Sequence, residues 1–550
     1  MKKLVSRFMA VLMAMTMILS MSMTAFAAEA PKGTLTVNNT VAGKTLDLYQ
    51  IFTATKNGDN VAYTLNSAYE GFFQNKITGA SKLTGEALSE KAYAYVKEQV
   101  GDDGSKGATF AKDILGWILS ASGETKTAVE STHSTADTAD TKTVIDNLVY
   151  GYYVVYPLGA TDTSTAPGNE TVKSVTSLVN VTDTTVTINM KSNYPTVVKK
   201  VNDKNADDVN IGDTVTYTLT SKVPDMTGYT SYVFNFKDTL AKGLTFGSIT
   251  SVKIGDVTIN ADTDGTKAEN TYTLTTKNNE DGTTEIKIEM NKFLASNANK
   301  AGQEIKVTYT ATLNKDAVTG FDPNTNKATV EYSNKPGTNE KGESEPSIVD
   351  VHTFDFTIYK YYLKDQNNKE DKTALAKAEF ELYKGNTEGT AADEQAKVNI
   401  VDEGEGVYRQ ATADEAKVTG FTSAKIVSDD DGKVLVKGLE AGTYYLRETK
   451  APEGYNKLLS DIKVEIKANY DPKTGKLTSY SVDYTYNGKT TNGAAITNKT
   501  DSPEVAVENK TGAQLPSTGS KGALMVTLAG IVLFGVLTAS KAFGKKKAKN

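Results

Sequence analysis

The chain has 550 residues and a formal net charge of −6, with 61 Lys and Arg against 67 Asp and Glu. This acidic balance argues against a nucleic-acid partner. The chain has no cysteine and only two histidines, His133 and His352, which excludes disulfides and thiol catalysis and disfavours His-based metal sites and most hydrolases. We therefore expect a protein that is not an enzyme and that binds no metal or cofactor.

The N-terminus has the features of a secretory signal peptide. Lys2, Lys3 and Arg7 precede an apolar stretch over residues 8–23, and Ala25-Phe26-Ala27 supplies a small-x-small cleavage pattern. We expect residues 1–27 to be removed on export. The remaining chain has room for about three domains of roughly 150 residues, each with its own core.

Most later segments are short runs of Val, Ile, Thr and Tyr that alternate with polar residues and are separated by Gly, Asn and Asp. This pattern is typical of β-strands, as in residues 214–220 and 305–311. It predicts an all-β fold of tandem immunoglobulin-like Greek-key β-sandwiches. Residues 85–100 and 110–120 break the pattern with helical spacing, which predicts a small helical insertion in the first domain.

The first domain is expected over residues 28–193. Its opening strand, residues 33–37, has no inward lysine, and residues 151–155 contain no acid. Lys44 precedes another predicted strand and is expected to be a surface residue. A covalent bond between a buried lysine and a buried amide side chain needs an inward lysine and a nearby acid. We therefore predict no such internal cross-link in this domain.

The second domain is expected over residues 194–349 and opens with a strand that contains two lysines. Val197, Lys199 and Val201 share one face by the two-residue period, whereas Lys200 falls on the other face. Lys199 is therefore favoured as the inward lysine. Burial in an apolar core favours the neutral, nucleophilic amine of a lysine.

The third domain is expected over residues 350–500. Phe354, Phe356, Ile358 and Lys360 share one face of its first strand, so Lys360 is also expected to point into the core. Apolar surroundings favour the protonated form of a carboxyl group, which can polarise a neighbouring carboxamide. An inward lysine beside an acid and an Asn could thus form an amide bond and release ammonia.

The C-terminus combines three features in a fixed order. Leu515-Pro516-Ser517-Thr518-Gly519 is followed by an apolar run over residues 523–537 and then by a lysine-rich tail. An apolar run with a cytoplasmic basic end stalls in the bilayer and holds the pentapeptide just outside. We expect residues 501–519 to form a spacer with this motif, and residues 520–550 to be removed after it.

This arrangement resembles the cell-wall sorting signal of Gram-positive surface proteins. The resemblance implies that a sortase cysteine attacks the carbonyl of Thr518, releases Gly519 and passes the acyl group to an amine. The implied location is the extracellular surface, anchored to the cell wall, and the implied partners include a pilin-specific class C sortase, a housekeeping sortase and peptidoglycan.

The third domain contains Gly442-Thr-Tyr-Tyr-Leu-Arg-Glu448-Thr-Lys-Ala-Pro-Glu-Gly-Tyr455, which resembles the pilin E-box of collagen-binding B-type repeats. In that family a first-strand lysine and a last-strand Asn join in an isopeptide bond, assisted by the E-box Glu. The resemblance implies these roles for Lys360, Asn498 and Glu448.

The order of segments in the second domain is similar to that in fimbrial shaft proteins. Here the resemblance implies that Asp238 is the acid and Asn334 the acceptor, with Asn326 as the alternative acceptor. Lys199 is favoured over Lys200 as the lysine.

Together these motifs resemble the shaft pilins of Gram-positive bacteria, which polymerise covalently with other copies and with accessory pilins. The family has an aromatic-Pro-Lys acceptor at the first domain junction, but this chain has Tyr194-Pro195-Thr196. Lys191 and Lys200 are the remaining candidates for the intermolecular acceptor. The implied function is a fimbrial shaft subunit that supports adhesion, and the alternative is a single-copy wall-anchored adhesin.

Overall fold

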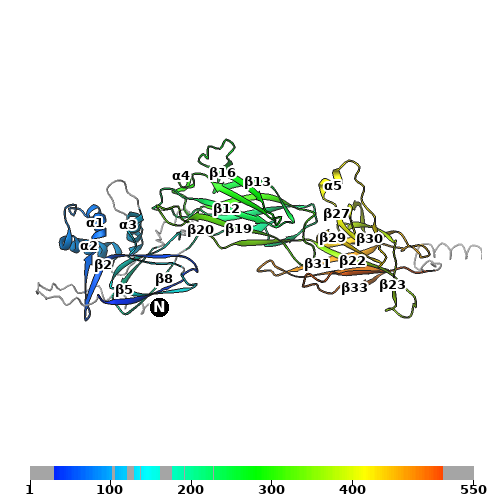
Figure 1. Cartoon of the computed structure of the whole chain (residues 1–550), viewed down its shortest axis with the longest axis horizontal. Helices are drawn as coiled ribbons and strands as arrows, with labels where there is room; N and C mark the ends of the chain where they lie inside the picture. Colours follow the sequence, from blue (N-terminus) through cyan, green and yellow to red (C-terminus); the bar gives the residue numbers. More distant parts are fainter. Residues whose placement is uncertain are drawn as a thin grey trace, which may run out of the picture.

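The computed structural model describes residues 30–101, 106–119, 129–136, 138–161, 176–190, 193–226 and 228–511. Figure 1 shows three strand-rich domains in a row along the long axis, coloured blue to cyan, green, and yellow to red. The expected signal peptide, Lys191 and the motif at 515–519 lie outside the described residues. In the described part, no helix is both long and apolar enough to cross a membrane.

The first domain contains two sheets. One has the order β5 (Lys142–Val149), β1 (Lys32–Asn38) and β8 (Thr185–Asn189). The other has the order β3 (Asn60–Leu65), β2 (Leu46–Asn57), β6 (Gly151–Pro157) and β7 (Ser177–Val181), with β4 (His133–Thr135) beside β2.

Both predicted helices of the first domain are present, as α2 (Gly85–Val100) and α3 (Gly107–Leu119). The structure adds a short helix that was not predicted, α1 (Glu70–Lys76), which follows a 3-10 turn. Phe72 and Phe73 of α1 are buried with Leu88 of α2 and Ile114 of α3 in one apolar cluster. The three helices therefore form a layer that shares this core with β2 and β6, and Figure 1 shows the layer beside β2.

The second domain is a sandwich of a large and a smaller sheet around a single apolar core. The large sheet has the order β10 (Ala206–Asp208), β21 (Ser347–His352), β19 (Asn324–Ser333), β12 (Phe234–Leu240), β17 (Thr284–Met290), β16 (Thr271–Asn278) and β15 (Asn260–Ala261), with β20 (Lys341–Glu343) beside β19. The smaller sheet has the order β14 (Val257–Thr258), β13 (Leu244–Ile254), β18 (Glu304–Leu313), β11 (Thr214–Lys222) and β9 (Val198–Val201). A short helix, α4 (Phe293–Asn297), follows β17.

The third domain repeats the two-sheet arrangement around a separate core. One sheet has the order β23 (Lys372–Ala374), β22 (Phe354–Leu363), β29 (Lys433–Leu439), β27 (Val407–Gln410) and β26 (Ile400–Gly404), with β34 (Glu504–Glu508) beside β22. The other has the order β25 (Ala392–Lys397), β24 (Glu379–Gly385), β30 (Gly442–Lys450), β31 (Ile462–Tyr470), β32 (Leu477–Tyr486) and β33 (Lys489–Thr491), with β28 (Ile426–Val427) beside β24. The short helix α5 (Ala413–Lys417) follows β27. The all-β prediction is confirmed.

Two domain boundaries differ from those expected. Strand β21 pairs with β19, so the second domain continues to His352 instead of ending at residue 349. Strand β34 pairs in parallel with β22, so residues 504–508, expected in a spacer, belong to the third domain. Val505 and Val507 of β34 are buried in the core of that domain, which explains why the strand packs there.

Polar contacts join the second and third domains directly. Asp208 accepts a hydrogen bond from the backbone N–H of Ala441 at 2.6 Å and another from the Tyr470 hydroxyl at 2.9 Å. Gly212 has φ +95° and packs so tightly that an added Cβ would lie 2.6 Å from Cα of Thr412. The two domains therefore meet in a close-packed interface with hydrogen bonds across it.

Candidate functional sites: two buried clusters of lysine, acid and amide

Lys199 lies in the core of the second domain, and its residue is only 2 % exposed. Its Nζ forms an ion pair with Asp238 and donates a hydrogen bond to the Tyr309 hydroxyl at 2.8 Å. The same Nζ lies 4.8 Å from the ring centroid of Tyr217. Burial lowers the pKa of Lys199 to about 8, although the negative charge of Asp238 opposes this shift.

Asp238 and Asn326 face the same interior from neighbouring strands. Asp238 on β12 pairs with Ala328 on β19, and Asn326 is two residues before Ala328 on the same face of β19. Asn326 is fully buried and donates a hydrogen bond from Nδ2 to the Tyr309 hydroxyl at 2.7 Å. A lysine, an acid and a carboxamide therefore meet in one buried cluster.

The hydroxyl of Tyr309 connects the three side chains. It accepts hydrogen bonds from Lys199 and Asn326 and donates one to Asp238 at 2.9 Å. These bonds use the hydroxyl's one proton and both lone pairs. They also bring Nζ of Lys199 and Nδ2 of Asn326 to within about 5.5 Å of each other. Tyr309 was not predicted as a site residue, although its Thr-Tyr-Thr strand pattern indicates an inward side chain.

Asn334, the acceptor favoured by resemblance, does not join this cluster. It follows the last residue of β19 and lies six residues beyond Ala328, which is roughly 20 Å along a strand. It packs instead near Gly159 of the first domain. The side chain of Lys200 likewise points away from the core and donates a hydrogen bond to Asn205.

The third domain builds a second cluster around Lys360, whose side chain is fully buried. Its Nζ lies 3.2 Å from Oε1 of Glu448, which is also fully buried, and 5.7 Å from the ring centroid of Phe380. Burial lowers the pKa of Lys360 to about 8, against the opposing effect of Glu448. Lys360 and Glu448 thus meet as the two sequence motifs indicate.

The amide of this cluster comes from Asn509, which directly follows β34 and is 1 % exposed. Its Nδ2 lies 3.4 Å from Oε2 of Glu448, and its backbone N–H donates to the carbonyl of Tyr361 at 2.9 Å. The parallel ladder that places Lys360 opposite Val507 holds Asn509 beside the lysine strand.

Asn498, the acceptor expected here, is exposed and lies in a turn. Its Nδ2 donates to Asp501 at 2.9 Å and its Oδ1 accepts from the backbone N–H of Thr500 at 2.9 Å. Its side chain therefore caps a local turn. The chain re-enters the core eleven residues later, at Asn509. Residues from 501 onward were expected in a spacer, so this re-entry was not predicted.

The two clusters share unusual polar atoms. The side-chain carbonyl oxygens of Asn326 and Asn509 are buried without a hydrogen-bond partner, and so is Oδ1 of Asp238. An unsatisfied buried oxygen costs about 1–3 kcal/mol. Each cluster therefore places a carboxamide with a free carbonyl oxygen beside an acid and a lysine, which is the set that amide formation needs.

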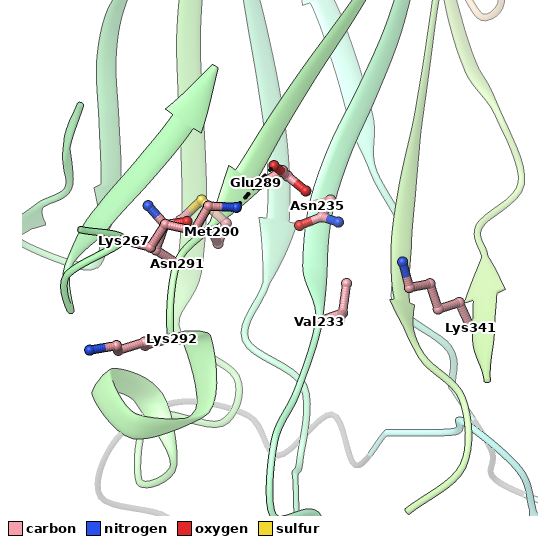
Figure 2. Close-up of a pocket in the computed structure, with 8 residues that line it drawn as sticks. All are labelled: Val233, Asn235, Lys267, Glu289, Met290, Asn291, Lys292 and Lys341. Carbon is pink, nitrogen blue, oxygen red and sulfur yellow. Dashed lines mark ion pairs between the residues drawn. The ribbon is translucent and has the colours of Figure 1, made fainter. Parts of the chain in front are cut away.

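The surface of the second domain also has a shallow pocket of about 260 Å³ beside β17. Figure 2 shows that three lysines surround it, Lys267, Lys292 and Lys341, with Glu289 forming an ion pair to Lys267 at 3.8 Å. It contains no set of catalytic side chains. Within the described ranges, no group of His, Cys, Asp and Glu could hold a metal ion.

Two domain families match the chain. Residues 211–336 match the Cna-B-like domain of Gram-positive pilin backbone subunit 2, and residues 362–480 match the SpaA prealbumin-like fold domain. These matches lie within the second and third domains and include Asp238, Asn326 and Glu448, whereas Lys199, Lys360 and Asn509 lie outside the matched ranges.

Similar proteins include two curated surface proteins. The chain is 27 % identical to the trypsin-resistant surface T6 protein of Streptococcus pyogenes, over 54 % of this chain and 50 % of that protein. It is also 27 % identical to the fimbrial subunit type 2 of Actinomyces naeslundii, over 47 % of this chain and 48 % of that protein. The chain thus spans about half the length of the curated relatives it matches.

Among solved structures, the T6 backbone pilin of Streptococcus pyogenes aligns with 88 % of this chain and 100 % of its own. The sequence identity is 17 % and the TM-score 0.42. The second and third domains of the chain thus each match a domain family, one of Gram-positive pilin backbone subunits and one of SpaA prealbumin-like folds.

Proposed function

We propose that this protein is a structural subunit of a covalently polymerised surface pilus, stiffened by two internal isopeptide bonds. The observation that carries the proposal is the pair of buried clusters, each of which joins the first strand of a pilin-type domain to a distant one. Export through the N-terminal segment and sortase transfer through Thr518 complete the proposal. Its partners are then sortases, other copies of the chain, accessory pilins and peptidoglycan.

The proposed reaction in the second domain joins Lys199 to Asn326. The neutral amine attacks Cγ of Asn326, the C–N bond to the carboxamide nitrogen breaks, and the lysine proton leaves with that nitrogen as ammonia. Asp238 takes the proton that the Lys199 ammonium gives up and donates it towards the amide oxygen as charge develops there. The low pKa of Lys199 supports this step because it raises the population of the neutral amine.

The third domain supports the same reaction with Lys360, Glu448 and Asn509. The Glu448 carboxylate contacts both the lysine and the amide, so no tyrosine bridge is needed. In each domain the product is a neutral amide in place of one buried amine and one carboxamide, and the acid remains beside it. The protein modifies itself once and turns over no substrate, so it is not an enzyme in the ordinary sense.

Intact mass of the exported chain, residues 28–514, tests the proposal. Each bond expels one ammonia through attack of the lysine on the carboxamide, so two bonds lower the mass by about 34 Da. We expect Asn326→Ala and Asn509→Ala each to reduce the deficit to one ammonia. Asn334→Ala and Asn498→Ala are matched controls that keep both bonds, and an unshifted mass in the unmodified chain would refute the cross-links.

A single-copy wall-anchored adhesin is the second candidate. It is favoured by one observation, the Thr196 that stands where a family acceptor lysine is expected. Wall extracts separate the two functions, because a polymerised shaft gives a ladder of high-mass species and a single-copy adhesin gives one band.

A further inference from the structure

Lys44 lies between the first and second domains and is not a simple surface residue. It precedes β2, and its Nζ donates hydrogen bonds to the Tyr332 hydroxyl at 3.2 Å and to the carbonyl of Glu343 at 3.3 Å, both in the second domain. The same nitrogen lies 5.0 Å from the ring centroid of Tyr194, in the segment that connects the domains. One amine thus contacts both domains and their connection.

The position of Lys44 combines a low-polarity environment with access from outside. Its side chain stands over two aromatic rings, with Nζ 5.8 Å from the ring centroid of Tyr332, and the residue is half-buried. Burial lowers the pKa of Lys44, while the nearby charge of Glu345 opposes the shift. Lys199 and Lys360 share this lowered pKa but are closed inside cores, whereas Lys44 keeps contact with solvent.

Glycines from both domains pack closely around Tyr332 and Asn334 at this site. An added Cβ at Gly342 would lie 2.8 Å from the Tyr332 ring, and one at Gly159 would lie 2.3 Å from Oδ1 of Asn334. Both values are shorter than real Cβ contacts. Bare backbone therefore packs against the ring of Tyr332 and holds it beneath the lysine.

The other candidate that the structure describes, Lys200, lies at the opposite end of the second domain. Its Nζ bonds the side chain of Asn205, and Asn205 in turn donates to the carbonyl of Lys473 in the third domain at 3.3 Å. Lys200 is therefore engaged at the junction with the third domain.

We propose that Lys44 is the intermolecular acceptor, the amine that receives the acyl group of Thr518 from a second copy of this chain. This inference rests on the proposed polymerisation. The neutral amine attacks the thioester carbonyl of the sortase acyl-enzyme, an N–C bond forms and the C–S bond breaks. The amine proton passes to the departing sulfur, so the products are an amide and a free cysteine thiol.

The test compares lysine-to-arginine variants of the full-length chain in cells that carry its pilus sortase. Arginine keeps the positive charge and the ring contact but does not form the amide. We expect Lys44→Arg to abolish the ladder while the monomer keeps its two-ammonia mass deficit, which shows that the second and third domains fold, and keeps the trypsin-digestion rate of its first domain, which shows that this domain folds. Lys200→Arg and Lys191→Arg are the matched controls and should leave the ladder intact.

Mass spectrometry of protease-digested polymer provides a direct second reading. We expect a branched peptide in which the Thr518 carbonyl is joined to Nζ of Lys44. A ladder that persists in Lys44→Arg, or a branch at Lys191, overturns the assignment but leaves the pilus function standing. No ladder from the unmodified chain overturns the pilus function itself.

Discussion

Asn326 donates its side-chain N–H to the hydroxyl of Tyr309 at 2.7 Å, and through that hydroxyl it is held next to Lys199. The contact positions the carboxamide before any bond forms. Positioning of this kind accounts for a large part of the rate of an intramolecular reaction.

Tyr309→Phe should therefore slow the second-domain bond without unfolding the domain. The ring stays stacked on Tyr217 at 5.1 Å between centroids, and only the bridging hydroxyl is lost. We expect the rate of isopeptide-bond formation to fall about ten- to hundredfold, because a reacting group that loses its alignment reacts more slowly by roughly this factor. The time course of the mass deficit after folding measures it.

Tyr272→Phe is the matched control for this change, because Tyr272 is buried in the same core but lies on β16 opposite Met290. This variant should form both isopeptide bonds at the original rate. Equal rates in the Tyr309 and Tyr272 variants would show that the hydroxyl bridge has no role.

Bond formation should also depend on pH. Burial lowers the pKa of Lys199 and of Lys360 to about 8, so each amine is increasingly neutral as the pH rises through 8. Below that value the neutral fraction falls about tenfold per pH unit, and the rate should fall with it. Refolding of unlinked chain from denaturant at pH 6 to 9, followed by intact mass, measures this. A rate that does not change with pH would contradict attack by a neutral lysine.

His352 should make the junction between the second and third domains sensitive to acid. Burial lowers the pKa of His352 to about 4, and both ring nitrogens lack a hydrogen-bond partner. Asp350 and Asp322 oppose the shift, and the ring packs against Phe354 and Tyr470.

The unfolded chain binds a proton at this histidine below its usual pKa of about 6.5, whereas the folded chain binds it only near 4. Stability is therefore lost as the pH falls from 6.5 to 4, by at most about 1.4 kcal/mol per unit from this group. We expect His352→Phe to flatten this part of the profile of melting temperature against pH. The same change at His133 serves as the control, and an equally steep profile in both variants would exclude His352 as the source.

The first domain should be the weakest part of the chain towards proteases. None of the buried polar residues in its described part is a lysine, so no internal cluster of the kind found in the other domains is present there. Limited trypsin digestion should remove this domain first and leave a fragment that begins near residue 194. In Asp238→Ala plus Glu448→Ala the remaining fragment should be digested too, and its persistence would show that its resistance does not come from the bonds.

Strand alternation was sufficient to place the two lysines. The faces shared by Val197, Lys199 and Val201, and by Phe356, Ile358 and Lys360, are buried as the two-residue period predicts. Glu448 could also be placed, because its motif is long and the part that contains Glu448 forms a single strand, β30. The direction in which these side chains point depends only on the local sequence of one strand, so the sequence alone could predict it.

The acceptors depend on register between distant strands, which one sequence does not reveal. Asn326 and Asn334 lie at the two ends of the same strand, and only the pairing of Asp238 with Ala328 shows which end is near the acid. Asn509 follows a strand of five residues in a polar, Pro-containing segment, where the alternation of Val505 and Val507 was the missed signal.

The position of Asn326 near the start of β19 has a mechanical consequence. Once Lys199 is joined to Asn326, and Lys360 to Asn509, a pulling force crosses the second and third domains each through one amide bond. Residues 327–359, which include most of β19, all of β20 and β21 and the first part of β22, then remain in the loaded path between the two covalent loops. If this whole segment detaches, it adds at most roughly 110 Å of length, its fully extended span. The shaft would thus combine two covalent loops that do not lengthen under load with one segment between them that does.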